Sequence, residues 1–399
     1  MKKLFSVLLA AIMLLSCVPM AFAGDAPAFA FRADGTFRIL QISDPQDDQN
    51  PAKDMLNLVR RAVETADPDL IVVSGDLVED SRTGDNATDL VPTEGVVVKD
   101  VKGNIIYDKT RANVETAVDA VFSILEEFGV PYVIALGNND RKVGLSSEDW
   151  LEIFSKYPHC VVFDESPDAE GGIDYHVTVK GTDDADKFNI WLMDSMRGGI
   201  SDAQVDWYKG ASKAITAANG GEPIPAFAFQ HIQAADIGNL FEACGPTDEG
   251  ARRVDSGWVR LNKEIAGGYN FYGWEPGATS YEFTAWKECG DVIAAYFGHQ
   301  HVEGFSGVWQ GIELGFTYGC EMAKVGPYGF RVFTLHENDI THYDNVLYRY
   351  TGKVQLGTDT VTAEVDTPYE THANSFVAFF AKLRNLFVSL FTAIVHLFA

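Results

Sequence analysis

Residues 130–140 read VPYVIALGNND, an apolar run that closes with glycine, two asparagines and an aspartate. Four other segments have the same form, because each places polar side chains directly after a strand-like apolar run. Functional groups in α/β sheets gather just beyond the carboxyl ends of strands, so we expect all five ends to meet in one crevice. The four other polar ends are Ser43-Asp44-Pro45-Gln46, Gly75-Asp76, Gln230-His231 and Gly298-His299-Gln300-His301.

The side chains delivered to this crevice are of the types that bind divalent metal ions. Two carboxylates, an amide and three imidazoles form a set that two cations can share. His299 and His301 alternate along an extended segment, so both can face the same side. The pattern predicts a dinuclear metal hydrolase. Its candidate ligands are Asp44, Asp76, Asn138, His231, His299 and His301.

Strand and helix patterns alternate along the chain, which predicts an α/β layered sandwich with functional loops on one rim. We also expect a hairpin that pairs residues 96–98 with residues 105–107. The predicted helices span residues 51–65 and 112–128. The predicted strands span residues 37–42, 70–74, 131–136, 175–179, 188–193, 226–229, 292–297, 312–318 and 329–336.

The charge balance of the chain limits its partners. With 57 acidic and 31 basic residues the formal net charge is -26, so the chain is not expected to bind nucleic acid through a basic patch. A small phosphorylated substrate remains compatible with this acidity, because bound cations reverse the electrostatic potential locally.

The N-terminus has the form of an export signal. Two lysines precede the apolar run 4–15, and small residues stand at positions 21–23, which predicts a signal peptide over residues 1–23. The alternative is a lipoprotein signal with an acylated Cys17. Either form predicts a secreted or cell-surface protein, and the short basic start is typical of bacteria.

Export changes how the remaining cysteines are interpreted. Four cysteines follow the signal, an even number in a compartment that permits disulfides. A Cys244–Cys289 disulfide and four buried free thiols are both compatible with the sequence. No pair has CxxC spacing, so a cysteine zinc site is not expected. The four are Cys160, Cys244, Cys289 and Cys320.

The C-terminal segment 375–399 is apolar apart from one polar stripe at helical spacing. This pattern predicts an amphipathic helix that associates with a membrane surface or with another copy of the chain. The alternative is a helix that packs on its own catalytic domain. The acidic, threonine-rich segment 353–372 is predicted to be its linker.

The five polar motifs, in this order, resemble the calcineurin-like metallophosphoesterases, which include the purple acid phosphatases. The pattern of that family is Asp-x-His, Gly-Asp, Gly-Asn-His-Asp/Glu, a single His and Gly-His-x-His. The segment 191–195, followed by Gln204 and Trp207, is similar to the phosphatase branch of the family. The resemblance implies an α-β-β-α sandwich as a catalytic domain over residues 35–345.

The resemblance also implies a chemistry, the hydrolysis of phosphate mono- or diesters by a metal-bound hydroxide. By the same resemblance, Asn139 orients the phosphoryl group and Asp140 braces its loop from behind the ligands. Two divalent cations are implied, drawn from Mn, Fe, Zn, Mg or Ca. The first would be held by Asp44, Gln46, Asp76 and His301, and the second by Asp76, Asn138, His231 and His299, with Asp76 bridging.

Gln46 is the first departure from the family pattern, because a histidine is expected there. A glutamine amide oxygen binds hard cations better than it binds zinc, so the first site is predicted to prefer manganese, magnesium or calcium. Asp47 or Asp48 could replace the missing ligand.

Asn139 is the second departure, because it stands where the family has the histidine that protonates the leaving oxygen. Asparagine donates a hydrogen bond but gives up no proton near neutral pH. Loss of general acid catalysis typically costs ~10²–10⁴-fold in rate, so reduced activity is expected. The alternative function is a catalytically impaired pseudo-phosphatase that binds a metal or ligand at the cell surface.

Overall fold

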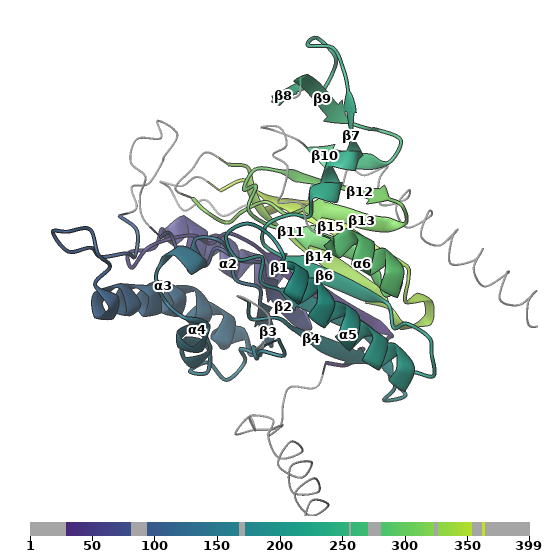
Figure 1. Ribbon diagram of the computed structural model, residues 1–399, viewed down its shortest axis with the longest axis horizontal. Coiled ribbons are helices and arrows are strands. Elements are labelled where there is room, and N and C mark those ends of the chain that lie inside the picture. The colour runs from purple at the N-terminus through teal and green to yellow at the C-terminus, as the bar shows by residue number, and fades with distance from the viewer. Residues whose placement is uncertain are drawn as a thin grey trace, which may run out of the picture.

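The computed structural model describes residues 29–80, 94–166, 172–254, 257–269, 281–322, 326–352 and 361–363. Two β-sheets pack against each other, and helices cover the outer face of each (Figure 1). The first sheet has six strands, with β1, β2 and β3 parallel and β14 antiparallel to β1. Its order is β16 (Val361–Ala363), β15 (Tyr343–Tyr350), β14 (Tyr328–His336), β1 (Thr36–Ile42), β2 (Leu70–Val73), β3 (Tyr132–Ile134).

The second sheet has seven strands, in which β5, β6, β11 and β13 run parallel. A separate three-stranded sheet stands at the upper end of Figure 1 and consists of β7 (Phe241–Ala243), β9 (Gly257–Leu261) and β8 (Arg252–Val254). The order of the seven strands is β10 (Ala266–Tyr269), β12 (Gly304–Trp309), β13 (Ile312–Phe316), β11 (Val292–Phe297), β6 (Ala226–Gln230), β5 (Asp186–Met193), β4 (Tyr175–Lys180).

The helices form the outer layers of the sandwich, which confirms the predicted α-β-β-α architecture (Figure 1). The first sheet is covered by α2 (Lys53–Ala66), α3 (Tyr107–Phe128) and α4 (Ser147–Phe154). The second sheet is covered by α5 (Asp202–Ala218) and α6 (Glu282–Cys289). A capping box begins α4 at Ser146 and another begins α5 at Ser201, so both helices have their first N–H groups satisfied.

The alternation of large and small residues in β6 explains how the layers meet. Phe227 and Phe229 belong to the core between the sheets, and Ala226 and Ala228 belong to the core under α5 and α6. Side chains of a strand alternate between its faces, so the sequence AFAFQ directs rings to one layer and methyl groups to the other. Phe227 meets Phe333 of the opposite sheet at a ring distance of 5.2 Å.

Most of the predicted elements are observed with ends shifted by a few residues, and three differences concern their extent. The fold continues beyond the predicted domain end at residue 345, because β15 runs to Tyr350. The short strand β16 lies within the predicted linker 353–372. The hairpin is reduced to one bridge, Lys99 to Ile105, because α3 already begins at Tyr107.

The prediction of a Cys244–Cys289 disulfide is wrong, since all four described cysteines are free thiols. Cys289 ends α6 and its thiol lies against Ser212 and Tyr208 of α5, whereas Cys244 directly follows β7. Cys160 and Cys320 are buried.

The predicted signal peptide 1–23 and the predicted helix 375–399 lie outside the described residues. Within the described ranges, none of the helices has the length and apolar character that a membrane crossing requires.

Candidate metal centre

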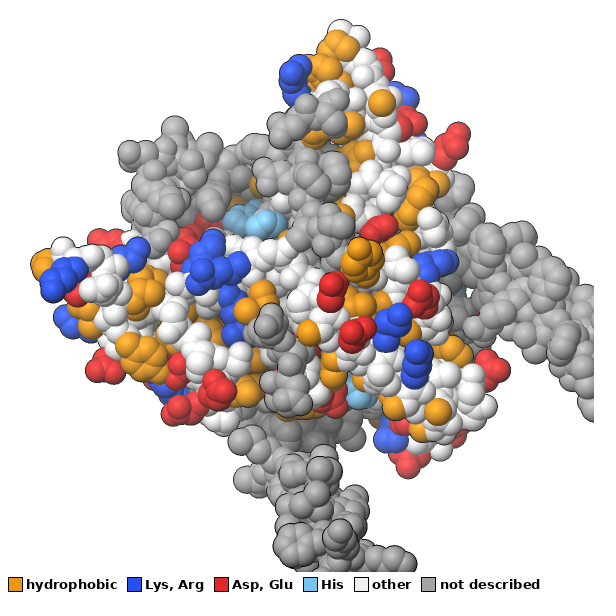
Figure 2. All heavy atoms as spheres, in the orientation of Figure 1, with side chains coloured by type: hydrophobic (Ala, Val, Ile, Leu, Met, Phe, Trp, Pro, Cys, Tyr) orange, Lys and Arg blue, Asp and Glu red, His pale blue; other side chains and the backbone are white. Residues whose placement is uncertain are grey.

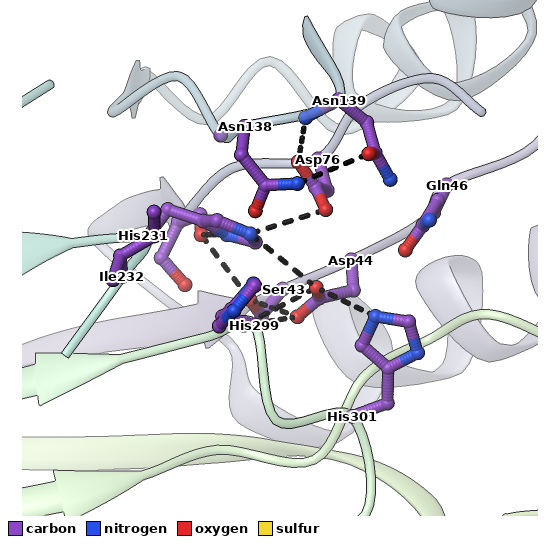
Figure 3. Close-up of polar contacts among 12 residues, drawn as sticks. Ser43, Asp44, Gln46, Asp76, Asn138, Asn139, His231, Ile232, His299 and His301 are labelled. Atoms are coloured by element: carbon purple, nitrogen blue, oxygen red, sulfur yellow. Dashed lines mark hydrogen bonds and ion pairs between the residues drawn. The ribbon is translucent and has the colours of Figure 1, made fainter. Parts of the chain in front are cut away.

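The predicted ligands meet at one rim of the sandwich, beyond the carboxyl ends of parallel strands in both sheets (Figure 3). The first sheet supplies the two carboxylates and the amide, which follow β1, β2 and β3. The second sheet supplies the imidazoles, which follow β6 and β11. The centre therefore straddles the boundary between the two sheets. Its members are Asp44, Asp76, Asn138, His231, His299 and His301.

The loops that carry these side chains have an unusual backbone. Asp44, Gln46, Asp76 and His299 have φ angles of 49°, 34°, 48° and 69°, in the left-handed region that non-glycine residues seldom adopt. Such conformations persist where surrounding structure enforces them, and they concentrate at functional sites. Here the backbone N–H of Asp44 donates to the Gly75 carbonyl at 3.0 Å.

Two motif glycines let the loops approach one another. A Cβ atom on Gly75 would lie 2.6 Å from His231 Nδ1, and one on Gly298 would lie 2.0 Å from Ser43 Oγ. Both contacts are too short for real atoms, so any side chain at either position would push the ligand loops apart. The glycines of the Gly-Asp and Gly-His-x-His motifs therefore have a packing role.

Asp76 belongs to both groups of ligands. In one group Asp76, His231 and His299 have ligand atoms within 4.8 Å of one another, and His231 Nε2 lies 3.1 Å from Asp76 Oδ2. In the other, Asp44, Asp76 and His301 meet the same limit, and His301 Nε2 lies 3.3 Å from Asp44 Oδ1. A carboxylate shared in this way occupies the position that a bridging ligand between two cations requires.

Two imidazoles are held by contacts behind them. His231 Nδ1 lies 2.9 Å from the Ser74 carbonyl oxygen, and His301 Nδ1 lies 2.6 Å from Glu321 Oε2. Each contact leaves Nε2 directed at the cluster, as happens when the other ring nitrogen of a metal-binding histidine is held by an oxygen. Glu321 was not predicted from the sequence, although it follows soon after the apolar run 312–318, which is a signal that could have identified it.

The charges of the cluster are strongly coupled. Burial alone would lower the pKa of His231, but the carboxylates of Asp76 and Asp44 outweigh it and raise the pKa to about 9. Burial of His301 is outweighed by Glu321 and Asp44, and its pKa rises to about 10. Burial and the neighbouring His231 lower the pKa of His299 to about 4.

Asp44 shows the complementary effect. Its burial would raise the pKa of the carboxyl group, but the two imidazolium neighbours, His301 first and His231 second, hold the pKa well below its ordinary range. Positive charge on His231 and His301 therefore balances the carboxylates, in the place that a divalent cation would otherwise take.

Gln46 lies beside this cluster with its amide in a defined orientation (Figure 3). Its Nε2 donates to Glu79 Oε2 at 2.9 Å, while its Oε1 is buried and has no hydrogen-bond partner. A buried amide oxygen without a partner is unfavourable unless a cation binds it. Gln46 therefore fits the role of an oxygen ligand to the Asp44, Asp76 and His301 group.

The replacement of the missing histidine by Asp47 or Asp48 stays a prediction, and the structure shows other partners for both carboxylates. Asp47 accepts hydrogen bonds from the backbone N–H groups of Asp48 and Ala52, both at 2.8 Å. Asp48 accepts from the N–H groups of Asn50 and Glu94, both at 2.7 Å. Both carboxylates are thus used to hold the loop that follows Gln46.

Asn138 bridges the histidines and the next loop. One end of its amide lies 2.8 Å from His299 Nδ1 and 3.2 Å from His231 Nε2. Its Nδ2, at the other end, donates to Asn139 Oδ1 at 3.0 Å, which leaves the oxygen facing the two imidazole nitrogens. In this orientation an oxygen lone pair faces the neutral His299 Nδ1, whereas the turned amide would donate to His299 and, at its other end, accept from Lys142 Nζ at 3.1 Å.

The residues predicted to act on the substrate lie above the cluster. The Asn139 N–H donates to Asp76 Oδ1 at 2.8 Å, and its side-chain oxygen accepts from Lys142 Nζ at 2.7 Å. Asp140 accepts from the N–H groups of Gly137, at 2.8 Å, and Val78, at 3.1 Å, so it braces the loop. Lys142 was not predicted from the sequence, although it stands only two residues after the motif.

A second buried network supports the loop from the other sheet. The Arg141 Nε donates to Asp194 Oδ2 at 2.8 Å, and Ser195 Oγ accepts from the Ile232 N–H at 2.8 Å. Asp174 lies behind them and accepts from the Asp194 N–H. Burial raises the pKa of Asp174 to about 7, and the Asp194 carboxylate adds to the effect.

Comparison with known proteins gives a consistent result. Residues 37–303 match the family model described as calcineurin-like phosphoesterase. The chain is 24% identical over 375 residues to the "Probable inactive purple acid phosphatase 14" of Arabidopsis thaliana, covering 82% of this chain and 81% of that protein. It is also 24% identical over 349 residues to the "Probable inactive purple acid phosphatase 28" of the same plant, covering 76% and 73%.

Among solved structures, one similar protein is a dimetal phosphatase from Danio rerio. The TM-score is 0.44 and the sequence identity 14%, over 82% of this chain and 98% of the other.

Proposed function

The chain belongs to the calcineurin-like phosphoesterase family of metal-dependent enzymes, and we propose that it hydrolyses small phosphate mono- or diesters outside the cytoplasm. The observation that carries the proposal is the place of Asp76 in both ligand groups. A shared carboxylate between two sets of imidazole, carboxylate and amide donors fits a pair of divalent cations.

When bound, two divalent cations supply Lewis acidity, which neutralises phosphoryl charge and activates water. The residues of the chain then act on the substrate around them. The side-chain Nδ2 of Asn139 is available to donate to a phosphoryl oxygen, because Lys142 occupies its Oδ1. Asp140 fixes the loop and Glu321 fixes the His301 ring, so neither group has to reorganise during the reaction.

The proposed enzyme has no proton donor at position 139, where asparagine cannot transfer one. We therefore expect slow turnover of esters with poor leaving groups. This substitution also favours a second candidate function, a metal- or ligand-binding pseudo-phosphatase, and two similar plant proteins are named as probably inactive. The six ligand side chains that the chain keeps support the enzyme over this alternative, and they are Asp44, Asp76, Asn138, His231, His299 and His301.

Export is part of the proposal and is supported by the sequence of residues 1–23 alone. We further propose that the segment 375–399 associates with a membrane surface or with a second copy of the chain, on the basis of its polar stripe. Mass spectrometry of the protein recovered outside the cytoplasm tests export, because it reports the residue at which the mature chain begins.

The test of the enzyme combines elemental analysis with assays on mono- and bis-nitrophenyl phosphate. Wild type should hold two metals per chain and show metal-dependent hydrolysis. Asp76→Ala should lose both metals and turnover, because each group of ligands depends on this carboxylate. Asp183→Asn, which changes an exposed ion pair with Lys187, should retain both.

Full activity of Asp76→Ala would show that the site has been assigned to the wrong residues. A wild-type protein that binds metals but hydrolyses neither ester under any divalent ion would favour the pseudo-phosphatase.

A further inference from the structure

Lys142 is a cation placed beside the metal ligands of a strongly acidic protein. The chain has 31 basic and 57 acidic residues, so a lysine at this rim is not a consequence of overall charge. Its Nζ lies 2.7 Å from Asn139 Oδ1 and 3.1 Å from the outer end of the Asn138 amide, which accepts from Lys142 when the amide is turned so that this end is the oxygen. The other end of that Asn138 amide contacts His299 and His231. Only the amide of Asn138, itself a predicted ligand, therefore lies between the ammonium and the two imidazoles.

From this geometry we infer that Lys142 binds the phosphoryl group of the substrate, an inference that rests on the proposed function. An ammonium has three N–H donors, and the contacts with Asn139 and with the turned Asn138 amide use two of them at most. A free donor is left to bind a non-bridging phosphoryl oxygen beside the cations. Because hydrogen bonds between charged partners are stronger than neutral ones, Lys142 contributes more to anion binding than Asn139 does.

The surroundings keep Lys142 available for this role. Among the described residues Lys142 forms no ion pair, whereas Lys156, Lys180 and Lys187 each pair with a carboxylate. Arg197 Nη2 donates to the backbone carbonyl of Arg141, the residue before Lys142, at 2.8 Å. Figure 2 shows basic side chains next to exposed histidine on this face of the molecule.

The inference has a consequence for substrate choice. A phosphate monoester carries up to two negative charges near neutral pH and a diester carries one. A fixed cation beside the metals therefore favours the more highly charged monoester through Coulomb attraction. Lys142 also occupies the side of the cluster on which Asn139 replaces the expected histidine, so it supplies charge there but no imidazole proton.

The experiment measures inorganic phosphate binding to the metal-loaded full chain by calorimetry, because this readout does not depend on turnover. The test variant is Lys142→Met and the conservative variant is Lys142→Arg. The matched control is Lys187→Met, which removes the same charge at the start of β5. Asp194, which contacts Arg141 of the ligand loop, lies beyond the opposite end of this strand. Elemental analysis of each variant reports whether its metals are retained.

Lys142→Met should weaken phosphate binding by about ten- to a hundredfold while both metals stay bound. Lys142→Arg should restore most of the affinity, and Lys187→Met should match wild type. In assays, Lys142→Met should lose more kcat/KM on nitrophenyl phosphate than on bis-nitrophenyl phosphate.

Two results would overturn the inference. Unchanged phosphate affinity in Lys142→Met would mean that the ammonium does not contact the anion. Loss of metal in the same variant would mean that Lys142 acts by holding Asn139 and Asn138 in place. A wild type that binds metals and phosphate but hydrolyses nothing would refute the phosphoesterase, while the affinities of the variants would still decide the role of Lys142.

Discussion

Gln46 donates a hydrogen bond to Glu79, and the 2.9 Å contact between Nε2 and Oε2 leaves the amide oxygen of Gln46 as the atom available to a cation. Glu79 follows β2 by only a few residues, so the same strand end carries the predicted ligand Asp76 and the residue that orients Gln46. With Gln46 as a ligand, this pairing would set the chemical character of the first metal position, because an amide oxygen is a harder donor than an imidazole.

Gln46→His should shift the metal preference of that position toward zinc. An imidazole binds borderline metals better than an amide oxygen does, and the change restores the family pattern. Competition dialysis with manganese and zinc, followed by elemental analysis, measures the preference. Gln46→Asn serves as a control, since it keeps the amide. An identical manganese-to-zinc ratio in wild type and Gln46→His would show that residue 46 does not bind the ion.

Asn139→His should raise turnover of alkyl phosphates more than turnover of nitrophenyl phosphate. An alkoxide needs a proton as it leaves, whereas nitrophenolate leaves readily without one, and only histidine can supply that proton near neutral pH. The comparison is the ratio of kcat values for the two substrate classes. Equal gains on both would contradict the idea that position 139 lacks a general acid.

Metal binding at pH 7 should release protons. The pKa values of about 9 for His231 and about 10 for His301 both exceed 7, so both rings are protonated before a cation arrives. On the order of two protons should leave per chain, and metal affinity should rise as the pH approaches these values. Calorimetry in buffers of different ionisation enthalpy counts the released protons.

Glu321→Gln provides the matched comparison for this measurement. It removes the carboxylate that most strongly raises the pKa of His301, so fewer protons should be released at pH 7. Heats that do not depend on the buffer in either protein would show that the metal-free histidines are neutral.

Asp174 should make the metal-free protein less stable as the pH rises from about 4 to about 7. Its pKa is raised from 3.8 to about 7 in the folded chain, so the unfolded state loses its proton first and is favoured across this window. Asp174→Asn stays neutral and avoids the penalty, which is at most roughly 4 kcal/mol at about 1.4 kcal/mol per pKa unit.

Urea unfolding of wild type and Asp174→Asn at pH 4.5 and pH 7.5 tests this difference. The free energy of unfolding of the variant should improve relative to wild type at the higher pH. The exposed Asp183→Asn change is the control. A constant difference between wild type and Asp174→Asn at both pH values would mean that Asp174 is already ionised in the fold.

The parts of the centre that the sequence predicts share one property, which is that each ligand directly follows an apolar strand. His231 follows the run that becomes β6, and Asp76 follows β2 after a single glycine and a serine. Sheet topology then brings distant strand ends together, so spacing along the chain is sufficient to find them. Strands with alternating ring and methyl side chains, such as β6, are predictable for the same reason.

The residues that were not predicted from the sequence lie in loops and contact ligands that are distant in the chain. Glu321 reaches His301 and Glu79 reaches Gln46 by side-chain contacts that no periodic pattern encodes. The strand β15 was missed for a different reason, since its inward-facing positions include a polar residue. Asn345 is buried there and accepts from Arg331 at 2.6 Å, so the apolar run that marks a strand is interrupted.

The division of ligands between the two sheets gives the centre a mechanical role. Cations that draw carboxylates and an amide from one sheet and imidazoles from the other would cross-link the two halves of the sandwich. No disulfide does so among the described cysteines. Removal of the metals by a chelator would then free the two sheets from each other at the rim that carries the ligands, while the aromatic core between the sheets still holds the rest. The metal-loaded centre would therefore determine how well that rim resists proteases and pulling forces.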